Sequence, residues 1–402
     1  MKKRVLLTGP LLSRSGYGEM ARFALRSLRT QEDKYEIYLH TINWGKTGWL
    51  WEDNEERKFI DTKLRDTLMY QNDGGQFDLS IQTTIPNEWK NLAPVNIGYT
   101  AGIETTDVSP EWIASANNNV DKVITISKHS ADVFRSTVYD SKQGETSHTL
   151  TCERPVDFVG FPIKTFDSDK NFNLNFKHNF NFLCVALAGP RKNIEMLMKC
   201  FVEEFKNDEV GLILKINGAN NSMLDFHATK ARVTGVMKSF PETKNKKCSV
   251  HLLHGAMTNS EMSALYNHRK VKCFTTLTHG EGFGLPLFEA AYSGLPVLAT
   301  GWSGHLDFLQ KDGKDLFASV KYDIGQLEPR HVWPGVLHAE SGWAYPNPEH
   351  AKRMMRDVFE NYKKWKTKAT TLKKHVNKQY TEKKMYSRFC QSVENIDGTF
   401  DD

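Results

Sequence analysis

Two glutamates, Glu281 and Glu289, stand eight positions apart with a glycine-rich turn between them. The apolar run before Glu281, Val271–Leu277, predicts a short buried strand. The segment Leu285–Ser293 predicts a helix with Pro286 in its first turn, where a missing N–H costs least. Glycines in such a turn let backbone N–H groups converge ahead of the helix, where its dipole favours negative charge. A site that attracts phosphate and also holds two carboxylates suits a nucleotide sugar.

The spacing of the two glutamates is also compatible with chance, because glycine-rich turns between strand and helix are common in α/β proteins. The full string Thr278–Ala290, with its Gly-Phe-Gly-Leu-Pro interior, closely resembles the E-x7-E signature of family-4 retaining glycosyltransferases. The next segment, Ser293–Thr300, resembles the following strand of the same unit. The resemblance implies a GT-B fold, in which two Rossmann-like domains face each other across a cleft. It also implies transfer of a sugar from a nucleotide-diphosphate sugar to a hydroxyl acceptor, with retention of anomeric configuration.

A second candidate element is the turn Gly189–Asn193, which is predicted to join a strand to a helix. Arg191 and Lys192 would place two cations at a helix N-terminus, which is a suitable clamp for a diphosphate. A solvent-exposed turn is the alternative. By resemblance, Lys192 matches the family's phosphate-gripping lysine. The family's upstream arginine is absent, since Ala186 and Leu187 occupy that stretch, so we expect Arg191 to substitute for it.

Two candidates lie in the first half of the chain. Gly16 and Gly18 follow the first predicted strand but lack the third glycine of a dinucleotide fingerprint, so a tight turn explains them equally well. The resemblance implies that this loop approaches the donor phosphates or the acceptor. In Tyr99–Thr106, a histidine that many family members carry is missing, and Glu104 is expected to face the donor sugar or the acceptor hydroxyl instead. A simple loop carboxylate is the alternative reading of Glu104.

The resemblance also assigns individual roles. The turn His254–Met257 corresponds to the family's turn that cups the nucleobase. Glu281 is expected to bind the sugar hydroxyls, and Glu289 is expected to bind the ribose hydroxyls. Neither glutamate is expected to be a covalent nucleophile. Gly301–His305 could turn N–H groups toward the donor, although Ser303 as a helix N-cap explains it almost as well. The expected catalytic residues are Glu281, Glu104, Lys192 and Arg191. The expected donor-binding residues are Gly16, Gly18, Arg191, Lys192, His254, Gly255, Met257, Glu281, Gly282, Phe283, Gly284, Leu285 and Glu289.

We expect neither a metal ion nor a cofactor besides the nucleotide-sugar donor. The fourteen histidines show no metal-ligand spacing, and Asp167-Ser168-Asp169 falls in a predicted linker. Arg191, Lys192 and helix dipoles would replace the cation.

The composition is that of a soluble chain of 402 residues, which suggests two or three domains. The six cysteines show no paired spacing, so a reducing cytoplasm is expected, or the host cytoplasm if the protein is viral. The apolar run after Met1-Lys-Lys-Arg4 ends at Thr8, too early for a secretory segment, and no window could span a membrane. Any membrane contact is expected to be peripheral.

Short apolar runs alternate with helical patterns in both halves, which predicts two parallel sheets covered by helices. The predicted strands are Val5–Thr8, Tyr35–Leu39, Asp78–Gln82, Val95–Tyr99, Val123–Ile126 and Val156–Ile163, then Phe180–Leu187, Val210–Ile216, Val250–His254 and Val271–Leu277. The predicted helices are Gly18–Leu28, one beginning at Ser127, Asn193–Phe205, Ser260–Tyr266 and Leu285–Ser293. The polar stretch Lys164–His178 is the expected linker. We expect an acceptor-side domain at 1–168, a nucleotide-sugar-binding domain at 169–370, and a helical tail at 371–402 that returns to the first domain.

The tail is strongly basic, because Lys352–Lys384 holds twelve Lys or Arg residues against three acids. A solvated helix is the plainest interpretation. The alternative is nucleic-acid binding, which would fit a phage enzyme that glycosylates hydroxymethylated bases in DNA, since Tyr99–Thr106 resembles glycosyltransferases of viral genomes. A glycan or an acidic membrane surface is a third possible acceptor, with the tail and Trp44, Trp49 and Trp51 as contacts. The sequence specifies neither the nucleotide, the sugar nor the oligomeric state.

Overall fold

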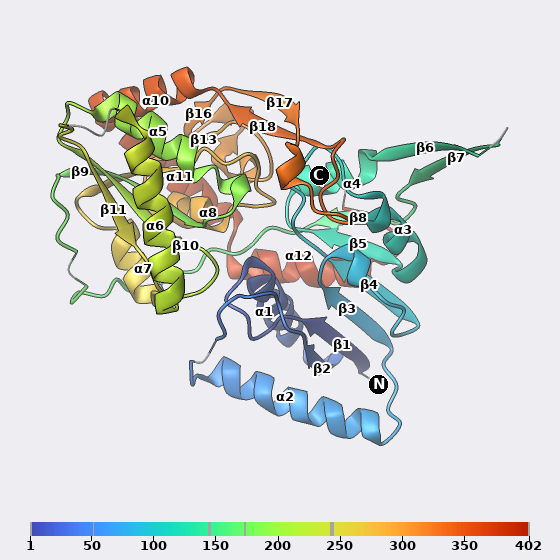
Figure 1. Cartoon of the computed structure of the whole chain (residues 1–402). Helices are drawn as coiled ribbons and strands as arrows, with labels where there is room; N and C mark the ends of the chain where they lie inside the picture. The colour runs from blue at the N-terminus through green and yellow to red at the C-terminus, as the bar shows by residue number, and fades with distance from the viewer. Residues whose placement is uncertain (1, 51, 144–145, 173, 242–244, 401–402) are drawn as a thin grey trace. The chain divides into compact units, whose positions relative to one another are not determined.

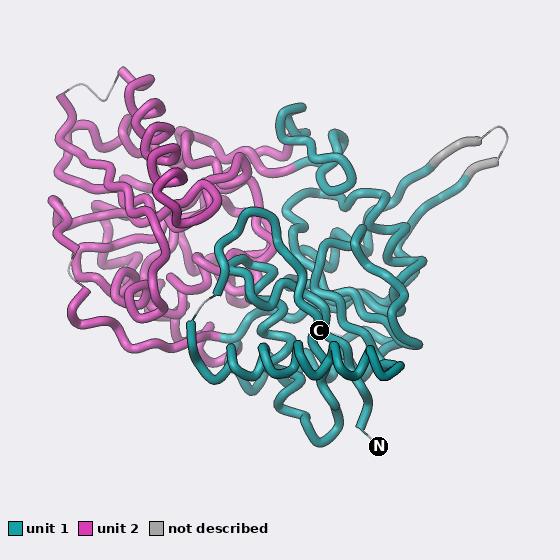
Figure 2. The backbone as a smooth tube through the Cα atoms, turned by 60° about the horizontal axis from the view of Figure 1, so that its bottom comes forward, with its two compact units in different colours: residues 1–162, 326–342, 380–402 teal, residues 163–325, 343–379 magenta. Residues whose placement is uncertain are grey.

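The computed structural model describes residues 2–50, 52–143, 146–172, 174–241 and 245–400, apart from the side chains of 141–147. Trp51 therefore lies outside the described residues. The chain divides into two compact units, each of which is built from non-contiguous segments (Figure 2). Unit 1 consists of residues 1–162, 326–342 and 380–402, and unit 2 of residues 163–325 and 343–379.

Unit 1 is a six-stranded parallel sheet with helices packed on it, in the strand order β2-β1-β3-β4-β5-β8 (Figure 1). Its sheet strands are β1 (Lys3–Gly9), β2 (Tyr35–Thr41), β3 (Leu79–Thr83), β4 (Val95–Tyr99), β5 (Lys122–Thr125) and β8 (Val156–Phe158). Its helices are α1 (Gly16–Arg29), α2 (Glu55–Asn72), α3 (Pro110–Asn119), α4 (Lys128–Ser136) and α12 (Glu382–Glu394). Strands β6 (Val138–Gln143) and β7 (Thr146–Thr151) form a separate antiparallel ribbon that extends away from the sheet.

Unit 2 repeats the architecture, with the strand order β11-β10-β9-β12-β13-β16 and parallel pairing throughout. These strands are β9 (Phe180–Leu187), β10 (Val210–Asn217), β11 (Ser249–Leu253), β12 (Val271–Thr275), β13 (Val297–Thr300) and β16 (Ala318–Val320). The helices are α5 (Ile194–Phe205), α6 (Met223–Ser239), α7 (Asn259–Tyr266), α8 (Leu285–Ser293), α9 (Leu306–Leu309), α10 (Pro348–Glu360) and α11 (Tyr362–Gln379). Two short strand pairs complete it, the antiparallel pair β14 (Gln310–Lys311) with β15 (Lys314–Asp315), and β17 (Tyr322–Gln326) with β18 (Gly342–Pro346).

The central strands β9 and β10 of unit 2 are apolar and buried over most of their length, as is usual for parallel strands that are covered on both faces. In β9, Phe182 and Leu183 have no exposed surface, and Phe182 packs against Phe201 and Phe205 of α5. The predicted α/β class with two Rossmann-like sheets is confirmed. The predicted strand Phe180–Leu187 and helix Leu285–Ser293 have the observed bounds of β9 and α8.

The compact units differ from the expected domain ranges at three places. Helix α11 remains in unit 2 to Gln379, because its apolar stripe packs there, so the return to unit 1 begins at residue 380 rather than 371. Helix α12 then packs against α1, as Phe389 meets Phe23 edge to face. The segment 326–342 belongs to unit 1, where His338 bonds the hydroxyl of Tyr139.

The stretch Lys164–His178 is not a free linker. The Asp169 N–H donates to the carbonyl of Ser260, and the Ser263 hydroxyl donates to the carbonyl of Phe166. Phe176 is 3% exposed, so the segment is fixed to unit 2 and the units separate at 162/163 instead of 168/169. Its polar composition concealed the single buried phenylalanine that anchors it.

Other predictions were incomplete. The strand predicted at Val156–Ile163 ends at Phe158. Helices α2 and α6 were not predicted. Each has few buried residues, only Ile60 and Thr67 in α2 and Thr229 in α6, so their apolar periodicity is weak.

Candidate active site

The glycine-rich turn lies at the carboxyl end of the unit 2 sheet, between β12 and α8. Gly284 has a φ of 88° and immediately precedes the helix. A Cβ at this position would come within 3.0 Å of Leu287 and 3.3 Å of the Cβ of His305. Glycine is therefore required here for both the backbone conformation and the space. Pro286 occupies the first turn of α8, as predicted.

Glu281 is almost completely buried, with 4% of its surface exposed, yet it is surrounded by cations. The Nζ of Lys192 lies 2.6 Å from Oε1 and 2.8 Å from Oε2 of Glu281. Arg191 donates from Nη1 to Oε2 of Glu281 at 3.0 Å. Burial alone raises the pKa of Glu281, but the charges of Lys192 and Arg191 outweigh it and lower the pKa to about 2. The side chain is thus a fixed carboxylate at neutral pH, which excludes it as a general acid there.

Backbone contacts hold the two basic residues against the glutamate turn. Arg191 and Lys192 belong to a short 3-10 turn, Pro190–Lys192, which follows β9. The N–H of His279 donates to the carbonyl of Arg191 at 2.9 Å, and Arg191 Nη1 donates to the carbonyl of Gly280 at 2.5 Å. Strands β9 and β12 are neighbours in the sheet, so their carboxyl ends bring the two turns together.

Ser303 is a site residue that the sequence did not identify in this role. Its hydroxyl accepts from the backbone N–H of Glu281 at 2.8 Å, and the Gly304 N–H donates to the carbonyl of Glu281 at 2.9 Å. Ser303 has a φ of 87°, a strained conformation for a non-glycine residue. The interpretation of Ser303 as an N-cap was wrong, because α9 begins after His305 and has no side-chain cap. The features of the sequence that could have identified Ser303 are Gly301, Gly304 and the pattern Trp302-Ser303-Gly304.

Glu289 is the fifth residue of α8 and is half-buried. Tyr266 of α7 donates its hydroxyl to Glu289 Oε2 at 2.8 Å. Burial, and then the charge of Glu289, raise the pKa of Tyr266 well above its usual value, so the tyrosine stays protonated and donates. The structure thus brings Glu281, Arg191 and Lys192 into one cluster and fixes Glu289 through a different partner.

The turn His254–Met257 follows β11 and is joined by hydrogen bonds to α6 and to β10. His254 Nε2 lies 2.6 Å from Asp225 Oδ2 on α6, and Lys215 donates to the carbonyl of Gly255 at 2.5 Å. Gly255 has a φ of 103°, with open space where a Cβ would stand. Met257 is half-buried. Sequence reasoning missed Asp225, whose only signal was its position three residues after the helix cap Ser222.

A cavity of about 140 Å³ lies between α5 and α6. None of the residues predicted to bind the donor lines it. Its lining residues are Ala188, Ile194, Glu195, Met198, Ile216, Gly218, Asp225, Ala228, Thr229, Arg232, Val233 and Val236.

The unit 1 candidates have structural roles of different kinds. A Cβ on Gly18 would overlap the carbonyl oxygen of Ser13 at 2.0 Å, so this glycine is needed for the close approach of the loop to α1. Gly16, in contrast, has open space at its Cβ position. Glu104 is half-buried, and its charge is among the causes that raise the pKa of Tyr17, after burial.

Tyr17, which stands between Gly16 and Gly18, is part of an aromatic pair. Trp44 packs against Tyr17 with ring centroids 4.4 Å apart, and the Tyr17 hydroxyl is 2.9 Å from the Thr100 hydroxyl. Trp49 is 55% exposed.

The described residues contain no group of three or more His, Cys, Asp or Glu side chains placed to hold a metal ion. Within the same residues, none of the helices is long and apolar enough to cross a membrane.

Comparisons with known proteins identify a family match and similar folds. Residues 166–328 match the family model "Glycosyl transferases group 1". No curated protein matches the sequence. Sucrose-phosphate synthase from Thermosynechococcus elongatus has a similar structure, with a TM-score of 0.63 at 12% identity over 98% of this chain and 99% of that one.

Two further solved structures share the fold. Anabaena HepE, in complex with UDP and glucose, gives a TM-score of 0.59 at 12% identity over 98% of this chain and 99% of its own. A glycosyltransferase from Rickettsia africae gives 0.58 at 11% identity over 98% of both chains. The protein therefore has a GT-B fold, and its residues 166–328 match a family model of glycosyl transferases.

Proposed function

We propose that the protein transfers a sugar from a nucleotide-diphosphate sugar to a hydroxyl acceptor with retention of anomeric configuration and without a metal ion. The observation that carries the proposal is the buried cluster of Glu281 with Arg191 and Lys192 at the carboxyl edge of the unit 2 sheet. Ligands of open α/β sheets bind at this edge. The E-x7-E resemblance supports retention and a family-4 assignment.

The charges in the cluster support diphosphate binding. One carboxylate faces two cations, which leaves an excess positive charge next to the 3-10 turn and the N-terminus of α5. A helix N-terminus favours an anion by itself, and Arg and Lys form strong charge-assisted hydrogen bonds with phosphate oxygens. On this proposal, Arg191 and Lys192 supply the charge stabilisation that a divalent cation supplies in metal-dependent enzymes.

Glu281 has two tasks in the proposed mechanism. It orients Lys192 and Arg191 before the donor arrives, and it accepts hydrogen bonds from the sugar hydroxyls. Because the pKa of Glu281 is about 2, it remains an acceptor throughout the reaction. Glu289, held by Tyr266, is proposed to bind the ribose hydroxyls.

The reaction exchanges one bond at the anomeric carbon. The bond from this carbon to the phosphate oxygen breaks, and the acceptor oxygen forms a new bond on the same face. The departing phosphate takes the acceptor's proton, so no protein side chain needs to become covalently attached. Preorganised cations next to the leaving phosphate stabilise the developing charge, which is usually a large catalytic contribution.

The donor is proposed to be a UDP-sugar, because structures of HepE with a similar fold are complexes with UDP and with UDP-glucose. We propose a cytoplasmic location from the cysteine pattern. The role in phage DNA modification stays a second hypothesis about the acceptor.

The test is transfer or hydrolysis of a panel of nucleotide sugars, with release of the nucleoside diphosphate as the signal. Glu281→Ala is expected to abolish release while the far-UV circular dichroism spectrum stays native. NMR of the product sugar is expected to show the donor's anomeric configuration. Unchanged turnover in Glu281→Ala, or an inverted product, would refute the proposal.

A further inference from the structure

The basic tail is not one uniform surface, because its three helices use their charges differently. On α10, Lys352 pairs with Glu203 and Glu349, and Arg356 pairs with Glu204 and Asp208. Those cations are structural. Helix α12 belongs to unit 1. The unusual element is α11, which carries seven lysines and no acidic residue over 18 positions.

The apolar and basic residues of α11 are separated on its surface. Its buried residues, Trp365, Ala369, Leu372 and Val376, follow one stripe at helical spacing. At 100° per residue, Lys363, Lys374 and Lys378 project from the opposite side, together with Thr367, Thr370 and Thr371. Lys366 and Lys373 flank that side. We call the exposed residues Lys363, Thr367, Thr370, Thr371, Lys373, Lys374 and Lys378 the α11 lysine face.

Some lysines of α11 have structural partners and others do not. Lys364 pairs with Asp357, and Lys366 and Lys368 donate to the carbonyls of Gly294 and Asp315. Lys363, Lys373 and Lys374 form no ion pair among the residues that the structure describes. These three therefore contribute charge to the surface without an ion-pair partner, although the aliphatic part of Lys373 packs over Gly294.

Helix α2 provides an internal comparison. It also has 18 residues and is largely exposed, but its four basic residues are matched by four acidic ones. Arg57 pairs with Asp61, Lys58 with Glu55 and Lys63 with Asp66. Balanced charge thus solvates α2. Like charges three or four positions apart, as in α11, destabilise a helix slightly, so solvation alone does not account for the lysine face.

We propose that the α11 lysine face docks the phosphodiester backbone of double-stranded nucleic acid. From Lys363 to Lys378 the face extends roughly 22 Å along the helix axis, at 1.5 Å per residue. A duplex presents two phosphates per roughly 3.4 Å of axis, so about six phosphates of each strand lie within reach. Lysines and threonine hydroxyls are the side chains that contact phosphate oxygens in such complexes.

The composition of the face favours nucleic acid over a membrane surface. A helix that lies in a lipid interface inserts apolar side chains such as Trp, Phe or Leu from its exposed side. On α11 the tryptophan, leucine and valine are all buried, and the exposed positions carry lysine and threonine. The face therefore offers charge without an apolar group that could enter the bilayer.

The experiment compares two variants with equal charge change. In the face variant, Lys363, Lys373 and Lys374 are all replaced by Gln. In the matched control, Lys58, Lys63 and Arg65 of α2 are replaced by Gln. Binding to a fluorescent 20-base-pair duplex of arbitrary sequence is followed by anisotropy between about 50 and 200 mM salt. A second arm uses vesicles of phosphatidylcholine with phosphatidylserine.

The wild type and the control are expected to bind the duplex with a salt-dependent affinity. The face variant is expected to bind on the order of tenfold more weakly, and its log–log salt slope should fall by about 3, at roughly 0.9 per lost phosphate contact. All three proteins should bind UDP-sugar equally, because the donor is assigned to the Glu281 cluster. Any of three results would overturn the proposal. These are an equal loss of duplex affinity in both variants, no duplex binding by the wild type at low salt, and vesicle binding without duplex binding.

Discussion

The Nζ of Lys192 lies within 2.8 Å of both carboxylate oxygens of Glu281, although 89 positions separate the two residues in the sequence. The contact joins the turn after β9 to the turn after β12, and it keeps a 4%-exposed carboxylate ionised. A buried charge of this kind is tolerated only when it is paired and hydrogen-bonded. The pairing therefore serves the fold, and on the proposed function it also prepares the donor site.

Replacement of Lys192 by Met should destabilise the protein, because Glu281 would keep only Arg191 as a cationic partner. We expect a loss of about 2–4 kcal/mol in the free energy of unfolding, measured by urea denaturation. The double variant Lys192→Met with Glu281→Gln should recover at least about 1 kcal/mol, since no uncompensated charge remains. If the two losses simply add, the pair is not coupled as described.

The pH dependence of stability should report the same pair. The pKa of Glu281 is lowered from 4.5 to about 2, so folding favours its ionised form. The stability from this group is fully present above pH 4.5 and is lost as the pH falls toward 2. It amounts to about 3 kcal/mol at most. Glu281→Gln should therefore lose less stability than the wild type between pH 5 and pH 3, and parallel curves would contradict the assignment.

Ser303 offers two changes with different consequences. Ser303→Gly removes the hydroxyl that accepts from the Glu281 N–H but suits the φ of 87°. Ser303→Ala removes the same hydroxyl and keeps the strain. Thermal unfolding should show Ala less stable than Gly by about 1 kcal/mol, and both should lower turnover. An alanine variant as stable as the glycine variant would show that the strain is not real.

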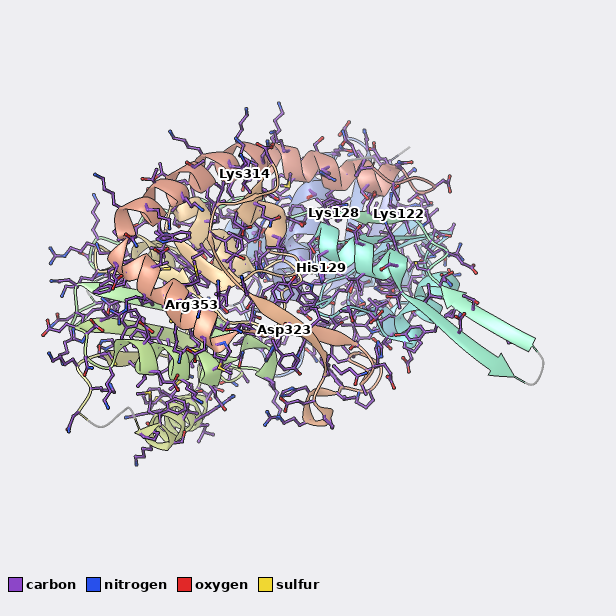
Figure 3. The ribbon with its side chains drawn as sticks, turned by 90° about the horizontal axis from the view of Figure 1, so that it is seen from above. Lys122, Lys128, His129, Lys314, Asp323 and Arg353 are labelled. Carbon is purple, nitrogen blue, oxygen red and sulfur yellow. The ribbon has the colours of Figure 1, made fainter. Side chains whose placement is uncertain are left out.

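A buried ion pair in unit 1 contacts the segment that follows α12. Lys122, labelled in Figure 3, has no exposed surface, and its Nζ lies 2.8 Å from Asp157. It also donates to the carbonyls of Asn395 and Gly398. Lys122→Met should cost about 3–5 kcal/mol and increase proteolysis after Glu394. Arg353→Met, on the surface of α10, is the control and should change neither quantity.

The sequence predicted the parts of this structure that depend on local pattern. The strand–turn–helix around Glu281 follows from an apolar run, three glycines and a proline, and all of these act within a few residues. The partnership of Glu281 with Ser303 depends on two turns, after β12 and after β13, meeting at one sheet edge, which no local pattern encodes. For the same reason, the sequence did not reveal Asp225 as the partner of His254.

Long-range packing also explains why the compact units differ from the expected domain ranges. Phe176 anchors a polar stretch that otherwise resembles a linker, and the contact of Tyr139 with His338 ties residues 326–342 to unit 1. Sequence composition detects neither contact, since each depends on a residue far along the chain.

The most direct measurement is the thermal shift produced by a panel of nucleoside diphosphates on the wild type, Lys192→Met and Lys199→Met. Lys199 lies exposed on the neighbouring helix α5 and serves as the control for loss of one charge. We expect at least one diphosphate, UDP first, to raise the melting temperature of the wild type and the control by about 2–5 °C. Lys192→Met, compared with its own ligand-free value, should show no shift. A full shift in Lys192→Met would contradict the assignment of the Glu281 cluster to the donor diphosphate.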